Sequence, residues 1–267
     1  MRTKFQKMMP YLMGRLPLLF FTYQFILRLW PGLMMQPIMD QFSIGASEFG
    51  VIAAFYYYGY AGLQAPVAML LDRFSPAKGL CAFAILCGLA NYLFLNTDNY
   101  YMAIFSRFLI GAGSAVGFLG VSKVISQWFS KDRYASMIGI SFSVGLMGAV
   151  YGGKPVAILV ENYGWKPVAL CLSLAAVVIG LLCGVFLKAP TKHTPDAPKG
   201  VIFRLQDLGP ILLSPAIWIL AIANLLMVGA LEGFADVWGI PYMMTAYGLA
   251  KCDAAALVSF IYVGLLF

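Results

Sequence analysis

Long apolar runs separated by short polar gaps fill most of the chain. A helix needs about 20 residues to cross about 30 Å of hydrocarbon, because each residue advances it by about 1.5 Å. Seven runs reach this length, at residues 16–39, 49–71, 79–96, 100–127, 134–160, 166–187 and 214–240. Open strands would leave backbone groups unpaired in lipid, so the runs predict helices and an all-α polytopic membrane protein.

An eighth apolar run extends from Ala254 to Phe267. As a helix these residues would reach only about 21 Å, which is short of a bilayer. We therefore expect a seventh helix followed by a truncated eighth. Two interpretations stay open: the sequence is a fragment of a longer protein, or it is the product of a truncated gene.

Composition excludes a water-soluble globule. Hydrophobic residues make up 61% of the chain, charged residues only 11%, and the mean hydropathy is +0.83. Soluble domains carry about 25% charged residues. The formal net charge is +7, but the basic residues lie in short gaps and form no stripe, so we expect no nucleic-acid partner.

Successive gaps between the apolar runs lie alternately on the two sides of the membrane and so form two sets. Basic residues are distributed unevenly between these sets. One set holds only Lys166 and Lys251. The other set, with the N-terminal segment, holds Arg2, Lys4, Lys7, Arg15, Arg73, Lys78, Lys131, Arg133, Lys188, Lys192, Lys199 and Arg204. The positive-inside rule places this richer side in the cytoplasm. We therefore predict a multi-pass protein of the plasma (inner) membrane with a cytoplasmic N-terminus.

The first apolar run is expected to remain in the mature protein. It is longer than the apolar core of a signal peptide, and Gln24 and Arg28 interrupt it. The only long polar, proline-rich stretch lies at 188–213. We predict an N-terminal six-helix transmembrane bundle over 1–187, a cytoplasmic linker loop over 188–213, and the incomplete start of a second bundle over 214–267.

No residue pattern indicates an enzyme, a metal or a cofactor. The single histidine, His193, lies in the linker with no second ligand or base nearby, and the cysteines form no evenly spaced disulfide framework. CxxC, HExxH and a GxSG-type serine are absent. We expect a non-enzymatic protein without cofactors.

Four local patterns resemble the signatures of one transporter family. They are the loop Ala68–Lys78 with Asp72-Arg73, the Arg-x-x-x-Gly-x-Gly sequence Arg107–Gly113, the glycine-rich stretch Gly139–Gly153, and Tyr163-Gly164-Trp165-Lys166. In this order they resemble the major facilitator superfamily. Ala68 and Ser75 replace two glycines of the family loop, and Gly153 stands where the antiporters of the family have proline, so antiport stays open.

Three further segments are similar to a narrower branch of that family. Phe25–Gly32, Phe55–Tyr58 and Leu70–Phe74 resemble lysosomal dipeptide exporters and bacterial phagosomal amino-acid transporters. The resemblance implies twelve helices in two halves with the substrate between them, of which this chain supplies the first half and the start of the second. It also implies alternating-access transport of a small polar or anionic solute. We expect proton coupling, because the family commonly uses it and no phosphate-binding loop is present.

Arg28 is the strongest candidate for a substrate-binding residue. A charge near the bilayer centre costs several kcal/mol unless it is paired or hydrated, on the order of 3 kcal/mol in insertion experiments. A guanidinium offers a planar, bidentate grip on a carboxylate; the alternative is a structural pair with a buried carboxylate. Gln24 lies one turn earlier on the same face. Tyr56, Tyr60 and Gln64 form a stripe that either lines a cavity or packs structurally.

Other charged residues are candidates for gating and coupling. In the family that the loop resembles, Asp72-Arg73 latches the cytoplasmic gate against the second half. Counting along the helices places four residues in the outer third of the membrane: Arg107, Lys154, Glu232 and Asp236. We expect an outer gate in which the carboxylates of Glu232 and Asp236 meet basic residues of the first half. Glu232 is the preferred proton-coupling group, because a desolvated carboxyl holds its proton more tightly.

The expected partners are a small-molecule substrate and the lipid bilayer. Alternating access needs two bundles. A second hypothesis is therefore a truncated or remnant half-transporter, inactive alone, or a half that needs the missing C-terminal half or a second copy.

Overall fold

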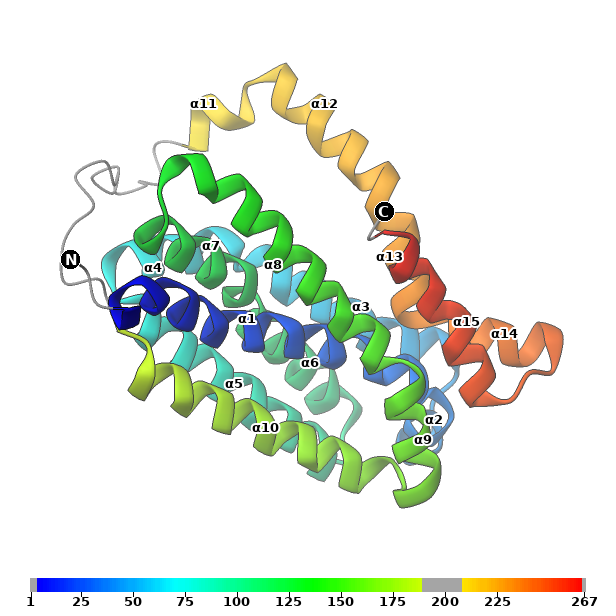
Figure 1. Ribbon diagram of the computed structural model, residues 1–267. Helices are drawn as coiled ribbons and strands as arrows, with labels where there is room; N and C mark the ends of the chain where they lie inside the picture. The colour runs from blue at the N-terminus through cyan, green and yellow to red at the C-terminus, as the bar shows by residue number, and fades with distance from the viewer. Residues whose placement is uncertain (1–3, 189–207, 266–267) are drawn as a thin grey trace.

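The computed structural model describes residues 4–188 and 208–265, and within these residues all regular structure is helical (Figure 1). The helices up to the linker are α1 (Lys4–Leu33), α2 (Met35–Phe42), α3 (Ala46–Gly62), α4 (Gln64–Arg73), α5 (Pro76–Asn96), α6 (Tyr100–Ser114), α7 (Val116–Trp128), α8 (Lys131–Gly152), α9 (Lys154–Tyr163) and α10 (Trp165–Phe186). The all-α prediction is confirmed.

A second group of helices follows the linker. It contains α11 (Leu208–Leu212), α12 (Pro215–Asn224), the π-helical turn η2 (Leu225–Gly229), α13 (Ala230–Gly233), the π-helical turn η3 (Phe234–Trp238), α14 (Gly239–Tyr247) and α15 (Lys251–Gly264). Most of the predicted 188–213 loop, including His193, lies outside the described residues, as does Arg2. The division into 1–187, 188–213 and 214–267 stays a prediction.

Several of the seven predicted spans are broken rather than straight. By length and composition, four described segments can cross a membrane: Pro76–Asn96, Tyr100–Trp128, Lys131–Tyr163 and Trp165–Phe186. A fifth is the first run, if its two helices, which meet at a bend of 65°, count as one. Pro31 precedes this bend, and proline removes a helical hydrogen bond. The second run breaks at Leu63, ahead of Pro66 in the first turn of α4.

The seventh run departs most from a regular helix. Two π-helical turns, η2 and η3, interrupt it and flank the short helix α13. A π turn holds an extra residue, so it rotates the side chains that follow, and such turns are frequent at functional sites. Glu232 lies in α13 and Asp236 in η3. The two acidic residues of this run therefore lie in or between its two π-helical turns.

Helix α1 is the centre of the bundle. It packs against α7, α8 and α10 and, on another side, against η3 and α14. Phe20, Leu27 and Trp30 on α1 are completely buried. Glycines permit the close helix contacts around it: a Cβ at Gly148 on α8 would overlap the Thr22 carbonyl of α1.

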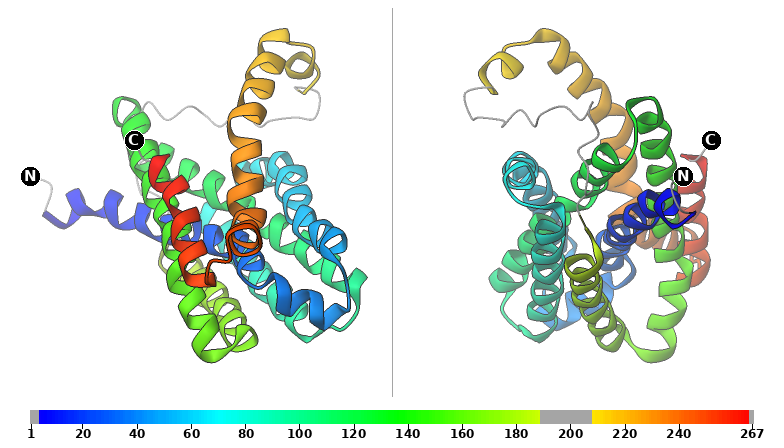
Figure 2. Two further views of the ribbon diagram at one scale, coloured as in Figure 1. Left: turned by 90° about the vertical axis from the view of Figure 1, so that its right-hand side faces the viewer. Right: turned by 60° about the vertical axis from the view of Figure 1, so that its left-hand side comes forward.

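The second group of helices meets the bundle at one end only. No residue of α12 is buried, and Figures 1 and 2 show α11 and α12 projecting away from the other helices. Beyond α12, the η3 residues Ala235, Asp236 and Val237 are buried, and α15 packs against α8 and α9. The two groups are thus joined at the η3 end and apart at the α12 end.

The close contact between α3 and α6 depends on Gly111 of α6. A Cβ at Gly111 would overlap the Tyr56 carbonyl oxygen, whereas a Cβ at Gly139 on α8 would meet nothing within 4 Å. We expect Gly111→Ala to lower the melting temperature of the detergent-solubilised protein, at a cost of about 1–3 kcal/mol from overpacking. Gly139→Ala, the matched control, should raise it slightly, because alanine favours helix. Equal melting temperatures for the two variants would contradict the packing.

Candidate functional site

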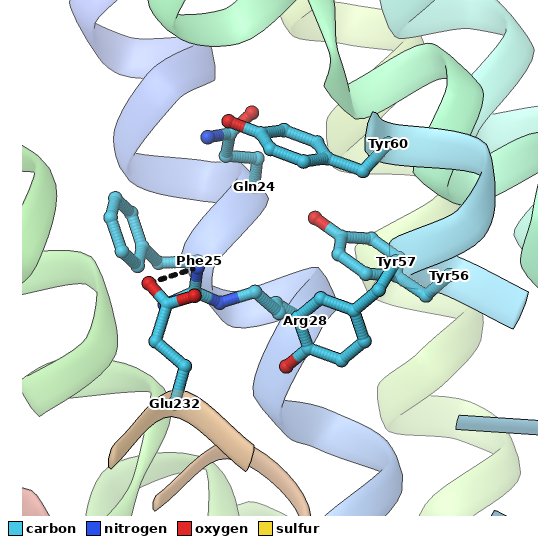
Figure 3. A pocket seen from close by; sticks show the side chains of 7 residues that line it. All are labelled: Gln24, Phe25, Arg28, Tyr56, Tyr57, Tyr60 and Glu232. Atoms are coloured by element: carbon cyan, nitrogen blue, oxygen red, sulfur yellow. Dashed lines mark hydrogen bonds and ion pairs between the residues drawn. The ribbon is translucent and has the colours of Figure 1, made fainter. Parts of the chain in front are cut away.

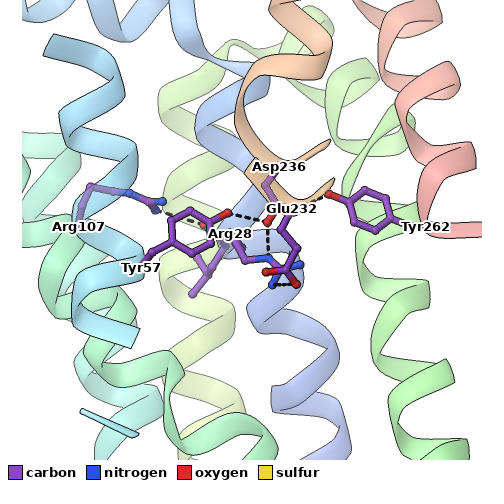
Figure 4. A network of polar contacts seen from close by, with 7 residues as sticks. Arg28, Tyr57, Arg107, Glu232, Asp236 and Tyr262 are labelled. Atoms are coloured by element: carbon purple, nitrogen blue, oxygen red, sulfur yellow. Dashed lines mark hydrogen bonds and ion pairs between the residues drawn. The ribbon is translucent and has the colours of Figure 1, made fainter. Parts of the chain in front are cut away.

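An ion-pair cluster joins α1 to α13 and η3, in the second group of helices (Figure 4). Arg28 Nη1 on α1 lies 3.1 Å from Glu232 Oε1 and donates a hydrogen bond to it. Arg28 Nε lies 2.7 Å from Asp236 Oδ2, although its N–H is poorly aligned with that oxygen. The Arg28 side chain is 12% exposed, that of Glu232 31% and that of Asp236 0%. One guanidinium therefore pairs with two carboxylates, a fully buried one and a partly exposed one.

Two tyrosines complete the surroundings of Asp236. The Tyr57 hydroxyl on α3 donates a hydrogen bond of 2.6 Å to Asp236 Oδ2. The Tyr262 hydroxyl on α15 donates to Oδ1. Each carboxylate oxygen thus accepts a hydrogen bond from a tyrosine, and Arg28 on α1 adds an ion pair. This compensates for the burial of Asp236, because a buried charge is tolerated only when it is paired and hydrogen-bonded.

Close backbone contact between α1 and η3 sets the geometry of the cluster. A Cβ at Gly32 would lie only 2.9 Å from the Asp236 carbonyl oxygen and 3.0 Å from that of Val237. Any larger residue at position 32 would force the two backbones apart. The glycine lies one turn after Arg28 on α1, so it brings the guanidinium within reach of the carboxylates.

A small polar cavity adjoins the cluster (Figure 3). Its volume is about 30 Å³, which is room for one or two water molecules. It is lined by Gln24, Phe25, Arg28, Tyr56, Tyr57, Tyr60 and Glu232. Gln24 is 5% exposed and its Oε1 has no hydrogen-bond partner. The cavity therefore offers a cation, a carboxylate and an unused acceptor within one enclosed space.

The structure gathers most of the predicted substrate-site residues. Gln24, Arg28, Tyr56 and Tyr60 line the cavity, whereas Gln64, beyond the break at Leu63, is not among its lining residues. The Tyr56 and Tyr60 rings stack with centroids 6.2 Å apart and an angle of 9°. This places side chains from α1, α3 and α13 around one cavity, and their role in binding stays a prediction.

Arg107 occupies a separate buried position behind the cavity. It is 1% exposed, and its Nη1 donates a hydrogen bond of 3.2 Å to the Leu27 carbonyl on α1. Its guanidinium carbon lies 4.9 Å from the centroid of the Tyr56 ring and 5.8 Å from that of Trp30. Within residues 4–188 and 208–265 no carboxylate forms an ion pair with it. Arg107 thus ties α6 to α1 through the Leu27 carbonyl and the Trp30 ring, and to α3 through the Tyr56 ring.

The remaining predicted gating residues lie elsewhere. Asp72 at the end of α4 pairs with Lys123 on α7, within the first six predicted spans and not with the second group of helices. Its neighbour Arg73 is exposed. Lys154 is exposed at the start of α9 and takes part in none of the ion pairs of the described chain. The carboxylates of α13 and η3 therefore meet Arg28 and neither Arg107 nor Lys154.

Sequence reasoning did not single out Tyr57 or Tyr262 as site residues. Tyr57 lies in the run Phe55–Tyr58, which entered only as part of a family resemblance. Tyr262 lies in the last apolar run, where its hydroxyl and that of Ser259 among apolar residues were the available signal. Both are recognised only once Asp236 is placed between them.

These observations define a class of protein: a multi-pass membrane protein in which a charged cluster joins two groups of helices around a polar cavity. A model of the Major Facilitator Superfamily matches residues 18–267. The chain belongs to the major facilitator superfamily, a family of membrane transporters, as the sequence resemblance predicted. The narrower branch stays a prediction.

Bacterial relatives of the chain carry transporter names. The chain is 29% identical over 160 residues to the uncharacterized transporter YybO of Bacillus subtilis, covering 58% of this chain and 36% of that protein. It is 23% identical over 173 residues to the probable sulfoacetate transporter SauU of Cupriavidus necator, covering 64% and 39%. The chain thus aligns with less than half the length of each of these relatives.

Solved structures share the fold. A bacterial homologue of the human lysosomal transporter Spinster, inward-facing and occupied, superimposes with a TM-score of 0.72 at 20% identity, covering 96% of this chain and 58% of the other. The inward-facing, unoccupied form gives 0.71 at 17% identity, covering 99% and 61%. At this identity the likeness shows the fold alone.

The two carboxylates of the cluster should differ in their importance for stability. Asp236 is fully buried with three partners, and breaking a buried pair costs about 3–5 kcal/mol. We expect Asp236→Asn to lower the melting temperature in detergent by about 6 °C or more. Glu232→Gln, at a partly exposed carboxylate, is the matched control and should lower it by less than half as much. A larger loss for Glu232→Gln would contradict the arrangement.

Proposed function

We propose that this chain forms part of a secondary transporter that moves a small polar or anionic solute by alternating access, coupled to protons. The observation that carries the proposal is the cluster of Arg28, Glu232 and Asp236 between two groups of helices, of which Arg28 and Glu232 line a polar cavity. Family membership supports transport in general. The relatives named for anionic solutes, such as the hexuronate transporter of Bacillus subtilis, at 22% identity, support an anionic substrate.

Arg28 is the group that we assign to a carboxylate or similar anion of the solute. Its bond to Glu232 lies beside the cavity and is the more exposed of its two ion pairs. A solute carboxylate entering there competes with Glu232 for the same guanidinium edge. Asp236, fully buried and held by both tyrosines, keeps its contact. Binding therefore exchanges one carboxylate for another at Arg28.

This exchange provides a physical basis for proton coupling. One guanidinium and two carboxylates carry a formal charge of −1 when all are ionised, and an uncompensated buried charge is costly. When a solute anion displaces Glu232, the negative charge near Arg28 increases further. Protonation of Glu232 then restores the original balance. The solute and a proton thus enter the cluster together.

The arrangement of the helices supports a conformation that is closed at the cluster and open at the opposite end. Arg28, Gly32 and Asp236 hold α1 against η3, whereas α12 has no buried residue. With the orientation that the basic residues predict, the open end faces the cytoplasm. In the plasma membrane this is an inward-facing state, and the cluster is the outer latch that opens in the alternate state.

The second hypothesis, a half-transporter that is inactive alone, rests on length. The chain aligns with 36–39% of its first relatives and superimposes on about 60% of the solved homologue. Alternating access needs two complete bundles. We propose that activity requires the remaining helices, supplied by the same chain or a second one.

The role of Arg28 is tested by comparing small carboxylates with their uncharged amides. We expect at least one carboxylate in a panel of sugar acids, amino acids and organic acids to raise the melting temperature of the wild-type protein, and its amide not to. Arg28→Gln should weaken the apparent affinity for that carboxylate tenfold or more, so that the carboxylate no longer stabilises the protein better than its amide. Arg133→Gln, at an exposed arginine at the start of α8, should leave that affinity unchanged. A carboxylate and an amide that stabilise the wild type equally, and both lose this effect in Arg28→Gln, would point to a purely structural arginine.

Proton coupling is tested at Glu232 in the complete transporter, reconstituted in proteoliposomes. We expect Glu232→Gln to abolish uptake driven by an inward proton gradient while solute exchange without a gradient continues, because the amide cannot release a proton. Glu161→Gln, at an exposed carboxylate on α9, serves as the control. Gradient-driven uptake that persists in Glu232→Gln would remove Glu232 from the coupling mechanism.

A further inference from the structure

An apolar groove lies between the first part of α1 and the last residues of α10, away from the Arg28 cluster. Its volume is about 560 Å³. The lining is almost entirely hydrocarbon, from side chains that include Leu12, Leu16, Leu19 and Phe186, and it also includes Arg15 and Lys188. Leu12, Leu19 and Phe186 are 47–56% exposed. In a membrane protein such side chains face the acyl chains of lipid.

The two cations of the groove lack acidic neighbours on their own helices. Residues 1–39 and 162–195 contain no aspartate or glutamate. Neither Arg15 nor Lys188 takes part in the ion pairs among the residues that the structure describes. Both side chains are exposed. Among the residues that the structure describes, the groove therefore combines a hydrocarbon lining with two positive charges that have no ion-pair partner.

The position of the groove matches the headgroup level of the bilayer. Arg15 and Lys188 belong to the basic segments that the positive-inside rule places on the cytoplasmic side, where anionic lipids attract basic residues. Arg15 precedes Arg28 by 13 residues, which is about 20 Å along a helix. The groove is thus a second site on α1, separate from the cavity between the two groups of helices.

We propose that this groove binds one anionic phospholipid from the cytoplasmic leaflet. Its phosphate lies between Arg15 and Lys188, and an acyl chain follows the apolar lining past Leu16 and Leu19. A soluble anion would contact only the two cations and gain nothing from the hydrocarbon lining. Basic pockets between transmembrane helices bind lipid headgroups for the same reason. The bound lipid fastens the start of α1 to the end of α10.

The proposal is tested by native mass spectrometry of the purified protein, titrated with phosphatidylglycerol or phosphatidylcholine of the same chain length. We expect one phosphatidylglycerol per chain to bind more tightly than phosphatidylcholine. Each cation contributes about 1 kcal/mol, which is about fivefold in affinity. Arg15→Gln with Lys188→Gln should therefore weaken phosphatidylglycerol binding about 25-fold. The control, Lys131→Gln with Arg133→Gln, removes the same charge from the start of α8 and should change it less than twofold.

Two further measurements separate the lipid from other occupants. Leu19→Trp fills the groove and should release phosphatidylglycerol with both cations intact, whereas soluble glycerol phosphate should not displace the lipid from the wild type. Equal weakening by the two charge variants, equal binding of the two lipids, or displacement by glycerol phosphate would overturn the proposal. A dimer that forms on delipidation and is abolished by Leu19→Trp would instead assign the groove to a second copy.

Discussion

The burial of one guanidinium is the constraint on which the rest of the structure depends. Arg28 lies on the central helix α1, and within the described residues the only carboxylates that pair with it come from the helix that follows the linker. A cation inside the membrane must be paired or hydrated. The first group of helices therefore depends on the second for its charge balance, and the contact between them is electrostatic at its centre.

The surrounding features make this contact possible. Gly32 lets the backbones of α1 and η3 approach, and the π-helical turns on both sides of α13 adjust where Glu232 and Asp236 point. Tyr57 and Tyr262 bring α3 and α15 to the same carboxylate. Four segments that are distant in sequence thus meet at Asp236. Opening this end requires breaking the ion pairs and the Tyr57 hydrogen bond, whereas Tyr262 and Asp236 belong to the same group of helices and can stay bonded, which suits a latch between two states.

The sequence was sufficient for the fold class and for recognising which charges matter. Apolar run lengths predict helices, and a charge among apolar residues singles out Arg28, Glu232 and Asp236 without any structure. The pairing was predicted only in general terms: the carboxylates were expected to meet basic residues of the first half, and the one they meet is Arg28, not Arg107 or Lys154. Counting residues gives the depth of a side chain in the membrane only when the helix is straight. The kink after Leu33, the break at Leu63 and the π turns alter both this depth and the direction in which side chains point. Lateral neighbours such as Tyr262 depend on helix packing, which no local pattern encodes.

The central claim is that Arg28 and Asp236 interact directly across the two groups of helices. A double-mutant cycle on the free energy of unfolding, with Arg28→Gln, Asp236→Asn and the combination, measures this interaction. The account predicts a coupling of about 1.5 kcal/mol or more, because Arg28→Gln leaves the fully buried Asp236 without its cation, a penalty that the double variant lacks. Additivity within about 0.5 kcal/mol would contradict it, since independent sites add in this way.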